Sequence, residues 1–246
     1  MTQVSILLIL AGTAALPAFL VYLWFRLSRS RFSLPWFLCS LLGGIAAVFT
    51  ALIMGFLFDG LCAAAGAALG GRLFPAGGFT GENVLVSVFR AAFVEELSRL
   101  IVLFPLFAVF RRLKWSFGEV PGGSAGYCAA GLVGGLGFAL AESASYSAAS
   151  AGAGLLRIFT AAPLHGACGG RAGLAVAAFR DNPAAGILRF LSAAAIHGMY
   201  NFLILRSGFS SVIAVLAAIS LFISSLAFIR KPLGRNREEG RRLPDE

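Results

Sequence analysis

The chain has 246 residues, of which 59% are hydrophobic and only 13% are charged, and its mean hydropathy is +0.86. A soluble domain carries roughly 25% charged residues, so this composition excludes an ordinary water-soluble domain and predicts a membrane protein. The net charge of +9 does not indicate a nucleic-acid partner, because the basic residues gather in short segments between apolar stretches.

The apolar segments predict an all-α polytopic bundle of about seven transmembrane helices, each near the roughly 20 residues that cross a bilayer. The first segment lacks the positively charged start of a signal peptide, so we expect it to remain as a span. The Gly-rich stretch Leu61–Gly70 predicts a half-helix or an outer loop, and a span there would raise the count to eight. The predicted spans are 4–25, 35–58, 84–110, 125–148, 157–179, 185–206 and 209–229.

The basic residues predict how these spans are oriented. Arginines and lysines follow the first, third, fifth and last spans, whereas the loops on the opposite side hold only Arg72 and Arg206. Positively charged loops stay in the cytoplasm, so we expect the N-terminus outside and the C-terminus inside. Residues 1–229 then form one transmembrane domain, with the catalytic spans within 84–206, and residues 230–246 form a basic, solvated cytoplasmic tail.

Ionisable residues inside the predicted spans indicate a functional site. Of the eleven acidic residues, only Glu95, Glu96 and Glu142 lie well inside apolar spans, and both histidines, His165 and His197, do so as well. A charged side chain at the bilayer centre costs roughly 2.5–3.5 kcal/mol on insertion scales, so such residues are functional candidates. The structural alternative is a set of interhelical hydrogen bonds and ion pairs that only holds the bundle together.

Depth along the predicted helices groups these residues. At a rise of ~1.5 Å per residue, Glu95 lies ~16 Å below the outer end of its span and Glu142 ~9 Å below the end of the next. By the same rise, His165 lies at ~12 Å and His197 at ~14 Å. Four helices therefore place ionisable groups in one layer of the outer half of the membrane, as a single site requires.

Nearby residues indicate supporting roles. Arg99 follows Glu95 by four positions and Glu96 by three, so it is within side-chain reach of either. Adjacent helical residues point about 100° apart, so one glutamate is expected to face the site while the other pairs with Arg99 or a neighbouring span. Two further candidates lie one turn from a site residue: Phe138 before Glu142, and Asn201 after His197.

This set of motifs resembles the PrsW family of intramembrane proteases, which is related to the type II CAAX prenyl proteases and the CPBP proteins. The resemblance covers roughly residues 84–206, and Glu142 favours the PrsW branch because the CAAX-type relatives usually have a histidine there. A lysine is frequent in the family at the position of Arg99, and an aspartate at that of Asn201. The matching motifs are Glu95-Glu96-Leu-Ser-Arg99, Gly137-Phe138-Ala-Leu-Ala-Glu142, His165 in PLHGACGG, and His197-Gly-Met-Tyr-Asn201.

The resemblance implies a multi-pass protein of the bacterial cytoplasmic membrane that hydrolyses a peptide bond in a membrane-anchored protein, such as an anti-sigma factor, near its extracytoplasmic side. A carboxylate held away from bulk water suits a general base, and we assign that role to Glu95 or Glu96. His165 and His197 would act as acid or oxyanion donors, with Asn201 as a further oxyanion donor. Glu142 would orient a histidine.

Two other chemistries use parts of this pattern. Glutamate and histidine from several helices can bind zinc, but the chain has no HExxH pair, so we expect a glutamic peptidase with no metal or other cofactor. The sequence from Gly122 to Gly126 fits the G-x-S-x-G pattern of serine hydrolases around Ser124. It lies at the predicted cytoplasmic end of a span, away from the histidines, so we interpret it as a helix start.

The alternative function is non-enzymatic, as a proton-coupled transporter or a scaffold that uses the same buried network, since intramembrane Glu and His residues also form proton relays. A transporter would usually show broken helices or inverted repeats, which this sequence does not show clearly. The Gly131-x-x-x-Gly135 spacing predicts close helix packing under either function.

Overall fold

The computed structural model describes residues 15–28, 32–68, 81–112, 123–179, 181–206 and 208–239. Within these ranges the chain forms seven helices and no strand, which confirms the all-α class. The helices are α2 (Leu16–Leu27), α3 (Leu34–Ala68), α4 (Gly81–Arg112), α5 (Gly123–Ala149), α6 (Ala151–Phe179), α7 (Pro183–Leu205) and α8 (Phe209–Glu239).

Four of the described helices are long and apolar enough to cross a membrane, which confirms a multi-pass membrane protein. Helices α4 and α6 are also long, at 32 and 29 residues, but each carries ionisable side chains within its apolar stretch. The count of seven spans and the N-out orientation stay predictions. The four segments are Leu34–Leu61, Gly123–Ser147, Pro183–Leu205 and Phe209–Arg230.

Three predicted segments differ from, or extend beyond, the described helices. The stretch expected as a half-helix or loop, Leu61–Gly70, instead continues α3 as far as Ala68. The tail expected from residue 230 begins as a helix, because α8 runs on to Glu239. Residues 4–14 of the predicted first span lie outside the described ranges, and Leu16–Leu27 forms a shorter apolar helix.

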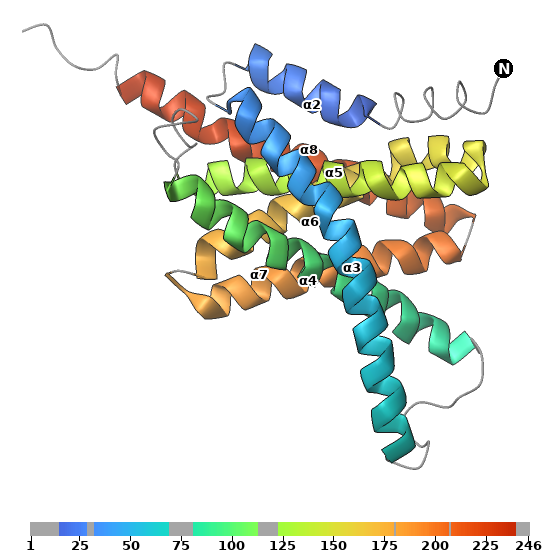
Figure 1. Ribbon diagram of the computed structural model, residues 1–246. Helices are drawn as coiled ribbons and strands as arrows, with labels where there is room; N and C mark the ends of the chain where they lie inside the picture. The colour runs from blue at the N-terminus through green and yellow to red at the C-terminus, as the bar shows by residue number, and fades with distance from the viewer. Residues whose placement is uncertain are drawn as a thin grey trace, which may run out of the picture.

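Helix α5 lies at the centre of the bundle, with 72% of its apolar segment buried, compared with 11% for α3 at the periphery. In Figure 1 the turn between α6 and α7 lies at one end of the bundle, and the α5–α6 and α7–α8 turns lie at the other. Consecutive helices therefore alternate in direction. The N-terminus of α7 is well defined, since Asn182 caps it by accepting a hydrogen bond from the Ala185 backbone N–H, with Pro183 in the first turn.

Glycines bring α5 and α6 into backbone contact, as the Gly131-x-x-x-Gly135 spacing predicts. A Cβ atom on Gly131 would lie 2.2 Å from the backbone oxygen of Gly169, and one on Gly135 would lie 2.0 Å from that of His165. No side chain fits in that space, so larger residues would separate the two helices. The close approach sets the position of His165 relative to the acidic residue on α5.

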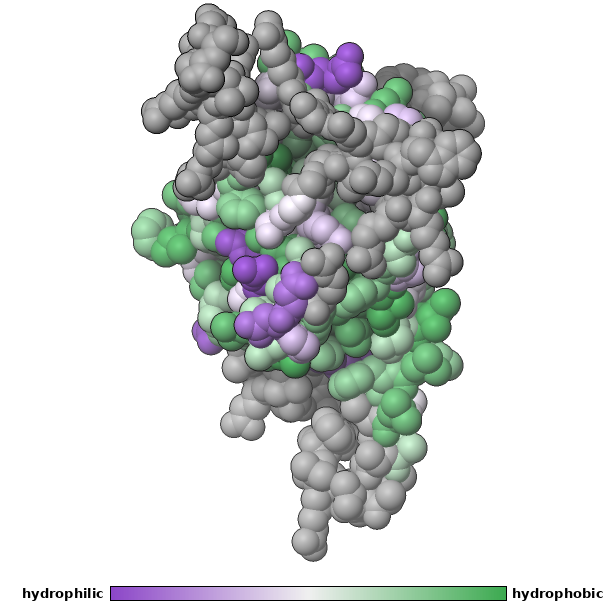
Figure 2. Space-filling view, turned by 90° about the vertical axis from the view of Figure 1, so that its left-hand side faces the viewer, coloured by the Kyte–Doolittle hydropathy of each residue, from purple (hydrophilic) through white to green (hydrophobic). Residues whose placement is uncertain are grey.

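The surface matches a membrane environment. Figure 2 views the end of the bundle where α6 turns into α7; most of the coloured lower surface is hydrophobic, and hydrophilic residues gather near the centre. The α6–α7 turn contributes the exposed Asp181 and Asn182 at this end. Along α3 the exposed side chains are large and apolar, including Phe49, Leu52 and Phe56. Such a face is suited to contact with lipid.

Candidate active site

Four helices contribute ionisable side chains to one cluster in the half of the bundle near the α5–α6 and α7–α8 turns. The spacing along the chain accounts for this position: Glu142 precedes the end of α5 by seven residues, and His197 precedes the end of α7 by eight. The cluster comprises Glu95, Glu96 and Arg99 from α4, Glu142 from α5, Arg157 and His165 from α6, and His197 from α7.

The two adjacent glutamates of α4 differ in environment. The side chain of Glu96 is fully buried; its Oε1 pairs with the Arg99 guanidinium and lies 2.8 Å from His197 Nδ1. The Glu95 side chain is 22% exposed, and its Oε2 is buried without a hydrogen bond, 3.6 Å from His197 Nε2 and 3.7 Å from Arg99 Nη2. The 100° between neighbouring helical positions thus directs Glu96 into the buried pair with Arg99 and leaves Glu95 partly exposed, while both carboxylates reach His197.

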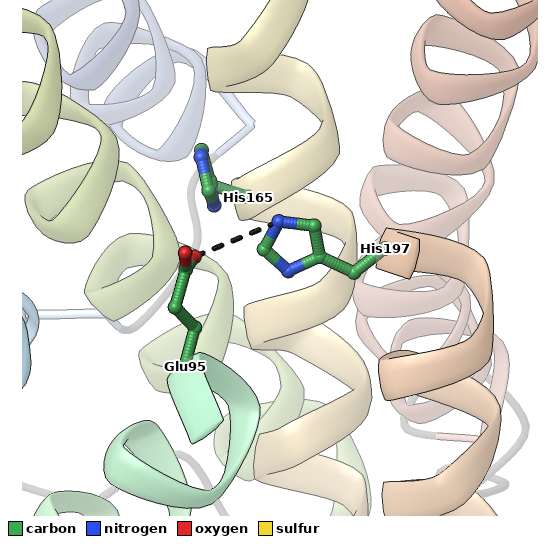
Figure 3. Close-up of side chains that lie close together, drawn as sticks. All are labelled: Glu95, His165 and His197. Carbon is green, nitrogen blue, oxygen red and sulfur yellow. Dashed lines mark ion pairs between the residues drawn. The ribbon is translucent and has the colours of Figure 1, made fainter. Parts of the chain in front are cut away.

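The His197 ring connects the two glutamates. Its Nδ1 contacts Glu96 Oε1, the oxygen that pairs with Arg99; a carboxylate oxygen accepts, so Nδ1–H donates and Nε2 is left facing Glu95. Figure 3 shows the Glu95 carboxylate and the His197 ring pointing toward each other, with His165 beside them. Glu95 Oε2 and His197 Nε2 therefore lie near contact distance, with no hydrogen bond between them among the described residues.

The His165 ring has a charged partner at each nitrogen. Its Nδ1 accepts from Arg99 Nη2 at 2.5 Å, and its Nε2 lies 2.7 Å from Glu142 Oε2. The ring packs against Phe138, with centroids 5.3 Å apart, and meets the His197 ring at 88° with centroids 5.0 Å apart. The Arg99 guanidinium also lies over the Phe138 ring, 4.1 Å from its centroid. His165 is thus held rigidly by its neighbours.

The structure brings all but one of the sequence-predicted site residues into this network. Glu142 contacts a histidine, as expected, and Phe138 supports both Arg99 and His165. Asn201 lies one turn beyond His197 on α7 and is half-buried, but its side chain makes no hydrogen bond with the cluster among the described residues.

Sequence reasoning missed Arg157. Its Nη2 lies 2.5 Å from Glu142 Oε2, and its guanidinium stacks on the Tyr146 ring, 4.1 Å from the centroid. The residue stands at the start of the predicted span 157–179, where an arginine is ordinarily assigned to the membrane surface. The sequence did contain a signal for this contact: Arg157 lies near the outer end of its predicted span, just outside the layer that holds the carboxylates.

The G-x-S-x-G segment lies where a helix start is expected. Helix α5 begins at Gly123, whose φ of +69° is in the left-handed region that favours glycine. Ser124 is exposed in the first turn, and 18 residues, about 27 Å of helix rise, separate it from Glu142. This serine is not part of the cluster.

Three side chains of the cluster have the chemistry and proximity for a metal ion. In the described part of the chain, donor atoms of Glu95, His165 and His197 all lie within 4.8 Å of one another. Each of the two histidines also has a second carboxylate neighbour, Glu142 for His165 and Glu96 for His197. Outer carboxylates of this kind accompany histidine ligands in zinc sites.

Comparison with known proteins agrees with this geometry. A family model described as PrsW family intramembrane metalloprotease matches residues 34–227, which include every member of the cluster. Searches of curated proteins and of solved structures gave no significant match. The match covers more than half of the chain, so the resemblance seen in the sequence motifs is confirmed. The chain belongs to the PrsW family of intramembrane proteases.

Proposed function

We propose that this intramembrane protease is an endopeptidase of the glutamic type in which Glu95 is the general base. The observation that carries the proposal is the buried Oε2 of Glu95, which has no hydrogen-bond partner and faces His197 Nε2 across 3.6 Å. A carboxylate oxygen in this position accepts a proton from a water molecule that attacks a peptide carbonyl.

The neighbouring groups support the remaining steps. After Glu95 has taken the proton from water, His197 Nε2 relays it to the nitrogen of the leaving amine, while Glu96 holds the imidazole through Nδ1. The Arg99 guanidinium, held by Glu96 and His165, lies 3.7 Å from Glu95 Oε2 and places positive charge beside this base. That charge stabilises the oxyanion of the tetrahedral intermediate.

The family description includes a metal, and the residues fit zinc by their donor types and by the unbonded Oε2 of Glu95. Glu95, His165 and His197 would hold the ion, which when bound supplies a water deprotonated near neutral pH. We propose that the site works without it. Arg99 already occupies His165 Nδ1 and places a cation beside Glu95, and both contacts oppose a second, divalent cation there.

We propose that the substrate is a single-span membrane-anchored protein, such as an anti-sigma factor, cut at or near its extracytoplasmic side. The cluster lies about 10–12 Å from the α5–α6 and α7–α8 ends of the helices, from the seven and eight residues that follow Glu142 and His197. If these ends face outward, as the predicted orientation requires, a segment near the outer end of the substrate span reaches Glu95 by unwinding a few turns.

The test is a cleavage assay in proteoliposomes with a panel of single-span substrates. We expect cleavage by the wild type, loss of cleavage with Glu95→Gln, and full cleavage with Ser124→Ala, which also serves as the matched control. Mass spectrometry of the products locates the cut. A cut in the cytoplasmic half would refute the outer-side proposal. Absence of any cleavage, together with proton flux that depends on Glu95, would favour the transporter function instead.

A further inference from the structure

Among the described residues, Glu142 is the one member of the cluster that Arg157 contacts. Arg157 precedes His165 by eight positions on α6, about 12 Å of helix rise. Its described contacts are with α5: Nη2 lies 2.5 Å from Glu142 Oε2, and the guanidinium stacks on Tyr146. The Arg157 side chain is 23% exposed, whereas that of His165 is 2% exposed, so Arg157 lies at the edge of the cluster.

One oxygen of Glu142 is shared between Arg157 and a histidine. Glu142 Oε2 lies 2.5 Å from Arg157 Nη2 and 2.7 Å from His165 Nε2. Both contacts place an N–H group at the same carboxylate oxygen. Because the Arg99 guanidinium can only donate, His165 Nδ1 accepts, so the proton of a neutral His165 ring is on Nε2, the nitrogen that faces Glu142.

The orientation of Arg99 depends on this arrangement. Arg99 donates to His165 Nδ1 and also pairs with Glu96, which holds His197. If the proton of His165 moved to Nδ1, that nitrogen would donate toward a guanidinium that can only donate, and the contact would be lost. Arg157 is therefore linked to Glu95 through Glu142, His165 and Arg99 in turn.

We propose that Arg157 is a positioning residue of the peptidase site: by pairing with Glu142 it holds His165 in the tautomer that anchors Arg99 beside Glu95. The proposal rests on the proposed function for its effect on catalysis. The packing of α5 against α6 does not depend on Arg157, because backbone contacts at Gly131 and Gly135 join the two helices further along. Loss of the guanidinium should thus leave the bundle assembled.

The kinetic test compares Arg157→Gln and Arg157→Lys with Arg189→Gln as the control. Arg189 is an exposed arginine on α7 that donates to the Leu174 backbone oxygen, outside the cluster. Outer partners that orient histidines in metal sites are worth about 10- to 100-fold in activity. By analogy, we expect Arg157→Gln to lower kcat by about that factor, with KM within about twofold. Arg157→Lys should recover part of the loss, and Arg189→Gln should match the wild type.

A double variant separates positioning from a general structural effect. If Arg157 acts through Glu142, then Arg157→Gln should lower kcat little further in a Glu142→Gln background. Losses of kcat that multiply in the double variant would overturn the proposal. So would a lower unfolding temperature for Arg157→Gln than for Arg189→Gln, if kcat per folded molecule did not change.

A second readout does not require activity. The chain contains only two histidines, so ¹⁵N NMR of histidine-labelled protein in nanodiscs gives two imidazoles, and His197→Gln assigns them. We expect His165 to show the Nε2–H tautomer alone in the wild type and in Arg157→Lys, and a mixture in Arg157→Gln. An unchanged His165 signal in Arg157→Gln would refute the proposal. A wild type that cleaves no substrate would refute the proposed function, and the NMR result would still decide the role of Arg157.

Discussion

Substituting each of the adjacent glutamates by glutamine should produce two different defects. Glu95→Gln conserves volume and removes a carboxylate whose Oε2 makes no hydrogen bond and whose nearest cation is 3.7 Å away. Without this charge Arg99 keeps its closer contact with Glu96, so the substitution should cost little stability. The fold should therefore persist. Activity should fall by about 10²- to 10⁴-fold, the usual contribution of a general base, which is about 2.7–5.4 kcal/mol at the barrier.

Glu96→Gln should act mainly on stability. Glu96 is fully buried and is the closest carboxylate to both Arg99 and His197, and Arg99 itself is only 2% exposed. Breaking a buried pair by removing one partner costs about 3–5 kcal/mol, because the other charge is left uncompensated. We expect a clearly lower unfolding midpoint for this variant, together with a loss of activity that follows from the displaced Arg99 and His197.

Both variants should be measured in the same proteoliposome cleavage assay and in the same SDS or thermal unfolding titration. The reasoning requires that Glu95→Gln retain the wild-type unfolding midpoint and that Glu96→Gln not retain it. Equal losses of stability for the two variants, with activity falling only in proportion to the unfolded fraction, would show that the network merely holds the bundle together.

Three further outcomes are expected. Purified protein should contain far less than one zinc per chain and keep its activity in a strong chelator; stoichiometric zinc, with activity lost to the chelator and restored by zinc, would reverse the metal-free proposal. A single cysteine placed in the tail of a cysteine-free variant should resist labelling from outside intact cells, and labelling there would refute the predicted orientation. Gly135→Leu should destabilise the protein by about 1–3 kcal/mol or more, since its side chain has to displace the His165 backbone. Gly55→Leu is its control, because an added Cβ there meets nothing within 4 Å.

The sequence by itself determined the class of the protein and most members of its site. Low charge content and long apolar segments leave only a membrane bundle, and the layer of Glu95, Glu142, His165 and His197 follows from helix rise alone. The motifs around these residues were sufficient to identify the family. Local spacing also showed that Glu95 and Glu96 point in different directions, since that difference is a property of a single helix.

Only the tertiary structure decided which glutamate is buried against Arg99, which one stays partly exposed, and which arginine pairs with Glu142. A helix sets the angle between two of its own side chains, but the rotation of α4 about its axis depends on its contacts with the helices around it. Likewise, Arg157 meets Glu142 because the Gly131 and Gly135 contacts bring α5 against α6, and their relative register is a property of the pair. The continuation of α3 to Ala68 was also not predicted, because the Gly-rich stretch from Leu61 favoured a half-helix or a loop. Helix propensity is a weak signal of this kind, since the surrounding structure often overrides it.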